Sequence, residues 1–156
     1  MGAFSGNVNK TVFLSASGVQ CSNTGNTNET TVKTVTIPAG TFQPNSVLII
    51  RALWSVNNDA SAKTLRIKVA GVLFMQAPMA SVASLHSYTA IHNRNSLSSQ
   101  VAAVSTTPVF FAGTSGTVAT ATIDTSASVD ITFTVTLTDG TDTGSLEAYQ
   151  IEVINP

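Results

Sequence analysis

Apolar and polar residues alternate without a break along residues 129–138. The odd positions are all apolar: Val129, Ile131, Phe133, Val135 and Leu137. The even positions carry Asp130 followed by four threonines, Thr132, Thr134, Thr136 and Thr138. Successive side chains of a strand point to opposite faces of its sheet, so this pattern predicts a strand with one buried face. The β-branched side chains favour the same structure.

The threonine-bearing face of this predicted strand carries almost no charge. Soluble sheets commonly place Lys and Glu on exposed faces and edges, where these residues prevent association. A flat, neutral face is better suited to being covered by another subunit than to contact with water. We therefore expect interface residues on this face and in the N-terminal arm, namely Thr132, Thr134, Thr136, Thr138, Phe4 and Lys10.

Similar runs recur along the chain between turn residues. They predict strands near 11–16, 32–37, 47–56, 63–70, 72–75, 88–95, 101–104, 109–112, 118–123 and 146–154. Residues 47–56 are apolar on one face and mostly apolar on the other, which is typical of a central strand covered on both sides. The polar turn at 57–61 suggests a hairpin between 47–56 and 63–70. The weaker pattern at 76–87 predicts a loop or one short helical turn.

About eight principal strands with turn punctuation and no amphipathic helix indicate an all-β protein, and a jelly-roll β-sandwich of antiparallel strands is the expected topology. We divide the chain into residues 1–31, an N-terminal arm with a short strand and a polar loop, and residues 32–156, the sandwich. The polar arm is either a frayed terminus or a segment that becomes ordered against a neighbour.

Composition adds a second argument for assembly. Only 10% of the residues are charged, against roughly 25% in a typical soluble domain. The net charge is −1 and the Lys and Arg residues are scattered singly, which argues against nucleic-acid binding. A surface so poor in charge is a solubility hazard for a lone chain, whereas interface centres are depleted of charge. We therefore expect an oligomer or a larger particle.

Localisation signals are sparse. The single cysteine, Cys21, allows no disulfide within the chain, which agrees with synthesis in a reducing cytoplasm. The first residues lack the basic and apolar regions of a secretory signal. Apolar runs are all far shorter than the roughly 18 residues that span a bilayer, so we expect no membrane insertion.

Candidate chemistry is weak throughout. His86 and His92 would share a strand face but lie too far apart for one ion, and no Cys or carboxylate cluster accompanies them. Residues 113–116 lack the pattern of a strained nucleophile turn. We expect no catalytic residue, no metal and no cofactor. Asp139 and Asp142 leave two alternatives open, a calcium loop or an ordinary hairpin turn.

One structural ion pair is predicted. Glu147 has the same parity as Tyr149 and Ile151, which places it on a partly buried face, where a carboxylate needs a partner. Arg51 and Arg66 are the candidate partners. The alternative is an ordinary glutamate at the end of a strand, in water.

The motifs resemble a jelly-roll module common in virion proteins of tailed bacteriophages. The opening motif is Thr36-Ile37-Pro38-Ala39-Gly40-Thr41-Phe42, continued by Asn45-Ser46-Val47-Leu48-Ile49-Ile50. Further matches are Lys63-Thr64-Leu65-Arg66-Ile67, His92-Asn93-Arg94-Asn95, Ser99-Gln100-Val101, Ile123-Asp124-Thr125 and Leu146-Glu147-Ala148-Tyr149. The resemblance covers residues 32–154 and implies a trimer that serves as a capsid decoration, head fibre or tail-appendage tip. The chain has no shaft or coiled coil, which favours a small self-contained piece.

Two functions of different classes follow. The first is a homotrimeric capsid decoration (cement) protein without enzymatic activity, located in the virion after assembly in the host cytoplasm, with itself and the major capsid protein or a tail-appendage protein as partners. The alternative is a receptor- or glycan-binding tip of a tail fibre or tail spike, whose loops 76–87 and 139–144 contact the host. Tyr88 is then the candidate sugar-binding aromatic, because Trp54 and Tyr149 fall on inward faces. A polysaccharide-degrading enzyme would need paired carboxylates, and no such pair stands out.

Overall fold

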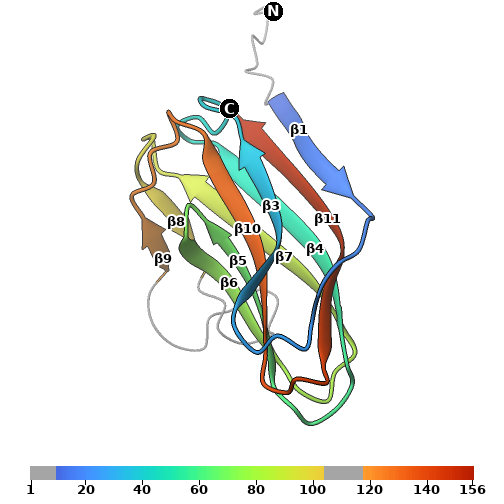
Figure 1. The fold of residues 1–156 in the computed structure, drawn as a ribbon. Helices are drawn as coiled ribbons and strands as arrows, with labels where there is room; N and C mark the ends of the chain where they lie inside the picture. The colour runs from blue at the N-terminus through green and yellow to red at the C-terminus, as the bar shows by residue number, and fades with distance from the viewer. Residues whose placement is uncertain (1–9, 104–117) are drawn as a thin grey trace, which may run out of the picture.

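The computed structural model describes residues 10–103 and 118–156, which form eleven strands and no helix (Figure 1). A bilayer-spanning helix is therefore not found among these residues. Phe4 and the strand predicted near 109–112 lie outside the described ranges. The all-β prediction is confirmed.

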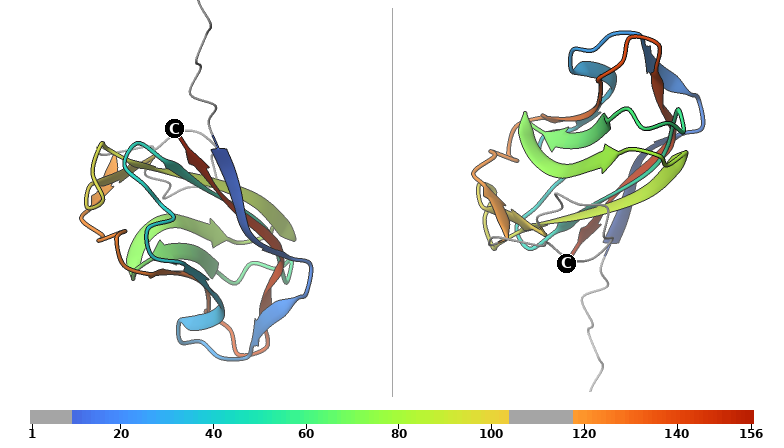
Figure 2. Two further views of the ribbon diagram at one scale, coloured as in Figure 1. Left: turned by 90° about the horizontal axis from the view of Figure 1, so that it is seen from above. Right: turned by 90° about the horizontal axis from the view of Figure 1, so that it is seen from below.

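Two antiparallel sheets stack face to face (Figure 2). The larger sheet has the order β1 (Lys10–Ser17), β11 (Thr143–Asn155), β4 (Val47–Val56), β7 (Ser84–Asn93), β8 (Gln100–Ala102) and β9 (Ala119–Ala121), and β2 (Cys21–Thr24) also pairs with β11. The smaller sheet has the order β3 (Thr30–Ile37), β10 (Val129–Leu137), β5 (Lys63–Val69) and β6 (Val72–Met79).

The pairing is nested in a way that defines a jelly roll. The outermost principal strands, β1 and β11, pair with each other, and so do β3 with β10, β4 with β7 and β5 with β6. The chain thus follows the path of one long antiparallel hairpin that has been rolled into two sheets. Strand β2 continues the line of β1 along β11, while β8 and β9 extend the opposite edge.

Two local predictions are wrong. Strands β4 and β5 do not form a hairpin, because β4 pairs with β11 and β7 in the larger sheet whereas β5 pairs with β10 and β6 in the smaller one. Residues 57–62 cross between the sheets. The stretch 76–87 is mostly strand, since β6 runs to Met79 and β7 begins at Ser84. A turn sequence indicates a reversal of the chain and leaves open which sheet receives the next strand.

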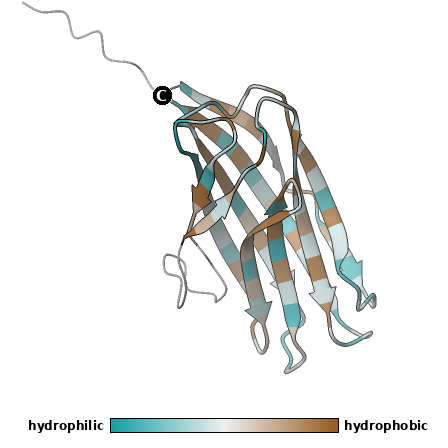
Figure 3. Ribbon diagram, turned by 90° about the vertical axis from the view of Figure 1, so that its left-hand side faces the viewer, coloured by the Kyte–Doolittle hydropathy of each residue, from teal (hydrophilic) through white to brown (hydrophobic). Residues whose placement is uncertain are grey.

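The core lies between the two inner faces, where apolar rows of β10, β5, β4 and β11 meet. The alternation of apolar and polar positions along the strands is visible in Figure 3. The Phe133 ring lies 5.9 Å from the Trp54 ring and 5.5 Å from the Tyr149 ring, centroid to centroid. The Trp54 indole donates a hydrogen bond to Ser87 Oγ at 3.1 Å. The inward placement of Trp54 and Tyr149 is confirmed.

At Gly144, β11 packs closely against side chains of β10. A Cβ atom added there would lie 2.6 Å from Val135 Cγ1 and 3.5 Å from Leu137 Cδ2. Both contacts are core side chains, which can move little in a close-packed interior. Glycine is therefore required at this position for packing.

We expect Gly144→Ala to destabilise the fold by about 1–3 kcal/mol, because the added methyl group overpacks the core against Val135. Urea unfolding measures this change as a lower midpoint. Gly18→Ala is the matched control, since a Cβ there meets no atom within 4 Å; it should change the free energy of unfolding by about 0.5 kcal/mol or less. Equal effects of the two substitutions would contradict the proposed close approach.

Candidate functional site

The outer face of the smaller sheet carries the threonines of β10. Thr132 lies opposite Lys68 of β5 and Thr34 of β3, and Thr134 lies opposite Arg66. The threonine row itself is uncharged, as its sequence requires, but basic residues of β5 line it. The expectation of a neutral face concerned this one strand, and its neighbour adds charge to the sheet face, because sequence parity describes one strand and not its neighbours.

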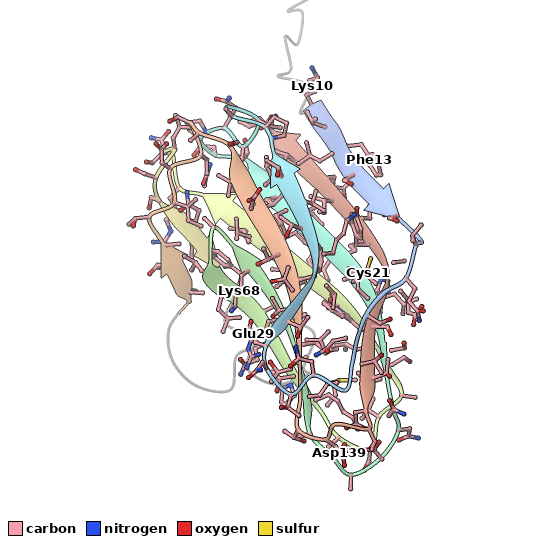
Figure 4. All side chains as sticks on the ribbon, in the orientation of Figure 1. Lys10, Phe13, Cys21, Glu29, Lys68 and Asp139 are labelled. Atoms are coloured by element: carbon pink, nitrogen blue, oxygen red, sulfur yellow. The ribbon has the colours of Figure 1, made fainter. Side chains whose placement is uncertain are left out.

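Glu29 closes this face with a network of charges. Its carboxylate accepts from Lys68 Nζ at 2.5 Å, lies 3.7 Å from Arg66 and accepts from Thr134 Oγ1 at 2.7 Å. The hydrogen bond from Lys68, supported by that from Thr134, holds the pKa of Glu29 below its usual value. Arg66 also donates to Thr136 Oγ1 at 2.7 Å. Figure 4 shows Glu29 and Lys68 side by side.

The predicted interface residues differ in their exposure to solvent. Thr134 is only 3% exposed, so it is covered by the chain's own side chains. Thr132 and Thr136 are half-buried, and Thr138 and Lys10 are exposed. Their place in an interface stays a prediction.

The outer face of the larger sheet is more apolar. Across β1, β11, β4 and β7, one row of neighbours is Phe13, Glu152, Ile49 and Ala90. The next row is Ala16, Gln150, Arg51 and Tyr88, and the third contains Ala148, Leu53 and His86. Three large side chains of this face are well exposed: Phe13 at 59%, Leu53 at 42% and Tyr88 at 40%.

The charges on this face compensate one another. Arg51 forms an ion pair of 2.5 Å with Glu152, and its guanidinium lies 5.7 Å from the centroid of the Tyr88 ring. His86 and His92 share the face, as predicted from their spacing. Within the described ranges, no three His, Cys, Asp or Glu side chains gather in a way that could hold a metal ion.

A shallow hollow of about 470 Å³ opens on this face where β1 ends. The side chains of Ala16, Arg51, Leu53, His86 and Gln150 contribute to its lining. It therefore combines apolar surface with groups that can donate hydrogen bonds, beside the exposed Tyr88 ring.

The predicted ion pair of Glu147 is wrong. A β-bulge between Leu146 and Ala148 shifts the parity of β11, so that Glu147 leaves the face of Tyr149 and points outward. There it accepts from Gln20 Nε2 at 2.8 Å and from Ser55 Oγ. The hydrogen bond from Ser55, followed by that from Gln20, lowers the pKa of Glu147.

The two candidate arginines lie beside carboxylates other than that of Glu147. Arg51 pairs with Glu152 on the larger sheet, and Arg66 lies near Glu29 on the smaller sheet. One unpaired residue in a bulge was enough to move Glu147 to the other face. The signal in the sequence is the spacing of three between the inward residues Leu146 and Tyr149, where a regular strand has spacings of two.

A buried lysine closes one end of the sandwich and was missed by the sequence reasoning. The Lys63 side chain is fully buried, and its ammonium contacts Asp59 and lies 3.3 Å from Asp142. Ser61 Oγ lies within hydrogen-bonding distance of the same two carboxylates and can donate its single proton to either of them. Burial opposes the charge on Lys63, but the hydrogen bonds to Asp59 and Asp142 outweigh burial and raise the pKa of Lys63. The parity of Lys63 with Leu65 and Ile67 was the available signal.

This cluster bears on the open question of the 139–144 loop. Asp139 accepts from the backbone N–H and the hydroxyl of Thr141, at 2.8 and 2.7 Å, which is an ordinary turn. Asp142 forms an ion pair with the Lys63 ammonium, so its carboxylate already has a positively charged partner. These partners account for both aspartates without a calcium ion.

The opposite end is closed by a neutral network of buried side chains. Asn93 Nδ2 donates to the carbonyls of Phe42 and Gln43, at 2.9 and 3.1 Å. The Gln100 amide uses both of its ends. Its Nε2 donates to Asn93 Oδ1 at 2.8 Å, and its Oε1 accepts from the Ile123 N–H at 2.7 Å. Residues of four of the sequence motifs therefore meet here. These motif residues stabilise the fold, which the motifs alone did not reveal.

Comparisons with known proteins add little. No family model matches the chain, and no curated protein matches it either. Among solved structures, dimeric latent PorU from Porphyromonas gingivalis is similar with a TM-score of 0.44 and 10% sequence identity. The similarity covers 94% of this chain but only 13% of that one.

Removal of the buried ammonium should be costly. We expect Lys63→Met to lower the free energy of unfolding by about 3–5 kcal/mol, because Asp142 is then left buried beside an apolar group. Lys68→Met is the matched control: its ammonium is part of a half-exposed pair on the sheet face, and its loss should cost about 1 kcal/mol or less. Chemical denaturation measures both. A Lys63→Met protein as stable as the wild type would contradict the role given to this pair.

The same cluster predicts a pH dependence. The hydrogen bond from Lys63, supported by Ser61, lowers the pKa of Asp59 well below its ordinary 3.8. A lowered folded-state pKa stabilises the fold above the ordinary value, and this stabilisation is lost as the pH falls below it. Asp59→Asn should therefore show a shallower loss of stability than the wild type when unfolding is followed from pH 4 downward. Parallel curves would show that Asp59 does not contribute to the acid sensitivity.

Proposed function

We propose that the chain is a structural bacteriophage virion protein, a homotrimeric capsid decoration protein that stabilises or decorates the head. The sequence resemblance suggests this setting, and the jelly-roll topology agrees with it. The observation that carries most weight is the outer face of the larger sheet, where exposed Phe13, Leu53 and Tyr88 surround the compensated pair of Arg51 and Glu152. Exposed aliphatic and aromatic side chains beside charges that compensate one another are compatible with a protein interface.

The mechanism is multivalent clamping. Each subunit offers one moderately apolar, open face, so a single contact is weak. Three linked subunits raise the effective concentration of the second and third contacts and slow the release of the whole. A threefold oligomer also matches local threefold axes of a shell. In this arrangement, the larger sheet faces the capsid protein.

A second candidate function rests on the hollow. A glycan could stack on Tyr88 while Arg51, His86 and Gln150 donate to its hydroxyl groups. This favours the receptor- or glycan-binding tip of a tail appendage. The face and the hollow overlap at Arg51 and Leu53, so a substitution at Leu53 reports on both functions and the choice of binding partner separates them.

The purified chain should co-sediment with capsids that lack it, and the bound amount should reach saturation as the concentration of the chain is raised. Leu53→Asp should weaken this binding about tenfold or more, because it buries a charge at the centre of the contact. Val82→Asp is the matched control, since Val82 is as exposed as Leu53 but lies in the 80–83 connection. Adsorption to host cells in place of capsids, sensitive to Leu53→Asp, would overturn the decoration function in favour of the appendage tip.

A further inference from the structure

The hollow on the outer face of the larger sheet lies where small residues stand among larger ones. Ala16 of β1 and Ala148 of β11 each contribute only a methyl group to its lining, and Gly18, which follows β1, contributes no side chain. Leu53 of β4 lies directly opposite Ala148 and forms part of the wall. The volume of about 470 Å³ falls within the roughly 300–1,000 Å³ of small-molecule sites. The hollow is therefore large enough for a small ligand.

Polar side chains in the lining offer both donors and acceptors of hydrogen bonds. The Gln150 amide has both kinds of group, and the exposed His86 ring adds two nitrogen atoms. The guanidinium of Arg51 has five N–H groups, and its contact with Glu152 is made by Nη1. A carboxylate ligand only accepts hydrogen bonds, whereas a hydroxyl group donates and accepts. This mixture of groups therefore suits a ligand that carries several hydroxyls.

The ion pair beside the hollow favours a neutral ligand. Arg51 lines the hollow and is paired with Glu152 at 2.5 Å. An anionic ligand that bonded to the Arg51 guanidinium would bring its own charge close to the Glu152 carboxylate, and like charges at short distance repel. A neutral ligand can accept from Arg51 without this cost.

Apolar surface borders the same polar groups. Tyr88 lies directly opposite Arg51 and is 40% exposed, and Leu53 in the next row is 42% exposed. A pyranose ring combines a face of C–H groups with hydroxyls around its rim. Aromatic and aliphatic side chains can cover such a face, while a few placed polar groups bind the rim. A wholly apolar ligand would instead leave Arg51 and Gln150 without hydrogen-bond partners.

We propose that the hollow binds a neutral pyranose and discriminates against acidic sugars. The C–H face of the ring lies against Tyr88 and Leu53. The hydroxyls of its rim bond to Arg51, His86 and Gln150. The carboxylate that is paired with Arg51 provides the discrimination, because it repels the carboxylate of an acidic sugar. This inference rests on the second candidate function, whose hollow it uses, and names the class of sugar.

Saturation-transfer NMR on the purified full chain tests the ligand class. The probes are the methyl glycosides of glucose, galactose and mannose, each compared with its uronic acid, which differs only at C6. At least one neutral glycoside should bind with a Kd of about 1 mM, because the hollow is open and the contacts are few. The corresponding uronic acid should bind about threefold more weakly or worse, because of the repulsion from Glu152.

Three substitutions test the position of the site. Ala16→Leu fills the hollow from an exposed position and should weaken binding about tenfold or more. Ala83→Leu is the matched control, since Ala83 is exposed and lies outside the lining, and it should bind like the wild type. Glu152→Gln removes the anionic partner of Arg51, so the uronic acid should then bind more tightly than the neutral glycoside. Circular dichroism should show all three variants folded, since none of these residues lies in the core.

The inference is overturned if no neutral glycoside binds, if the wild type prefers the uronic acids, or if Ala16→Leu leaves binding unchanged. Adsorption to host cells supplies the separate readout for the second candidate function. A chain that binds a neutral glycoside in the hollow and does not adsorb to host cells would support the sugar site and overturn the appendage tip. Host-cell adsorption by a chain that binds none of the glycosides would leave the tip intact and overturn the sugar site.

Discussion

Packing of Phe133 against Trp54 and Tyr149 holds the two sheets together. Phe133 belongs to β10, a central strand of the smaller sheet, while Trp54 and Tyr149 belong to β4 and β11, which lie side by side in the larger one. Because these strands are hydrogen-bonded on both edges, the ring contacts join the middles of two sheets. Aromatic pairs contribute about 0.5–1.5 kcal/mol each beyond the burial of their area. The rest of the core extends this contact along the strands.

The two ends of the sandwich are closed by chemically different means. At one end, the Lys63 ammonium lies between two carboxylates contributed by the crossings that follow β4 and β10. At the other, Asn93 and Gln100 bond the backbone of loops that arrive from distant parts of the chain. A buried polar group without its partner costs about 1–3 kcal/mol, so each network favours one loop arrangement over others. Hydrophobic burial favours a sandwich, and these networks specify which one.

Local patterns in the sequence predicted what local physics controls. Alternation along 129–138 identified β10 and its inward face, and the same parity placed Trp54 and Tyr149 in the core. The failures have non-local or irregular causes. Pairing of β4 with β11 joins strands about a hundred residues apart, and the bulge beside Ala148 reversed the face of Glu147. At Lys63, the parity with Leu65 and Ile67 indicates burial, but its two acidic partners become neighbours only in the fold.

The ion pairs strengthen the physical case for assembly. Of the seven Lys and Arg residues, Arg51, Lys63, Arg66 and Lys68 are in ion pairs among the described residues. A fifth, Lys33, is turned toward an aromatic ring. A net charge far from zero keeps protein chains apart by repulsion, and this chain has a net charge of only −1. A chain with few charges, most of its cations already partnered, has little electrostatic repulsion to oppose contact with other proteins.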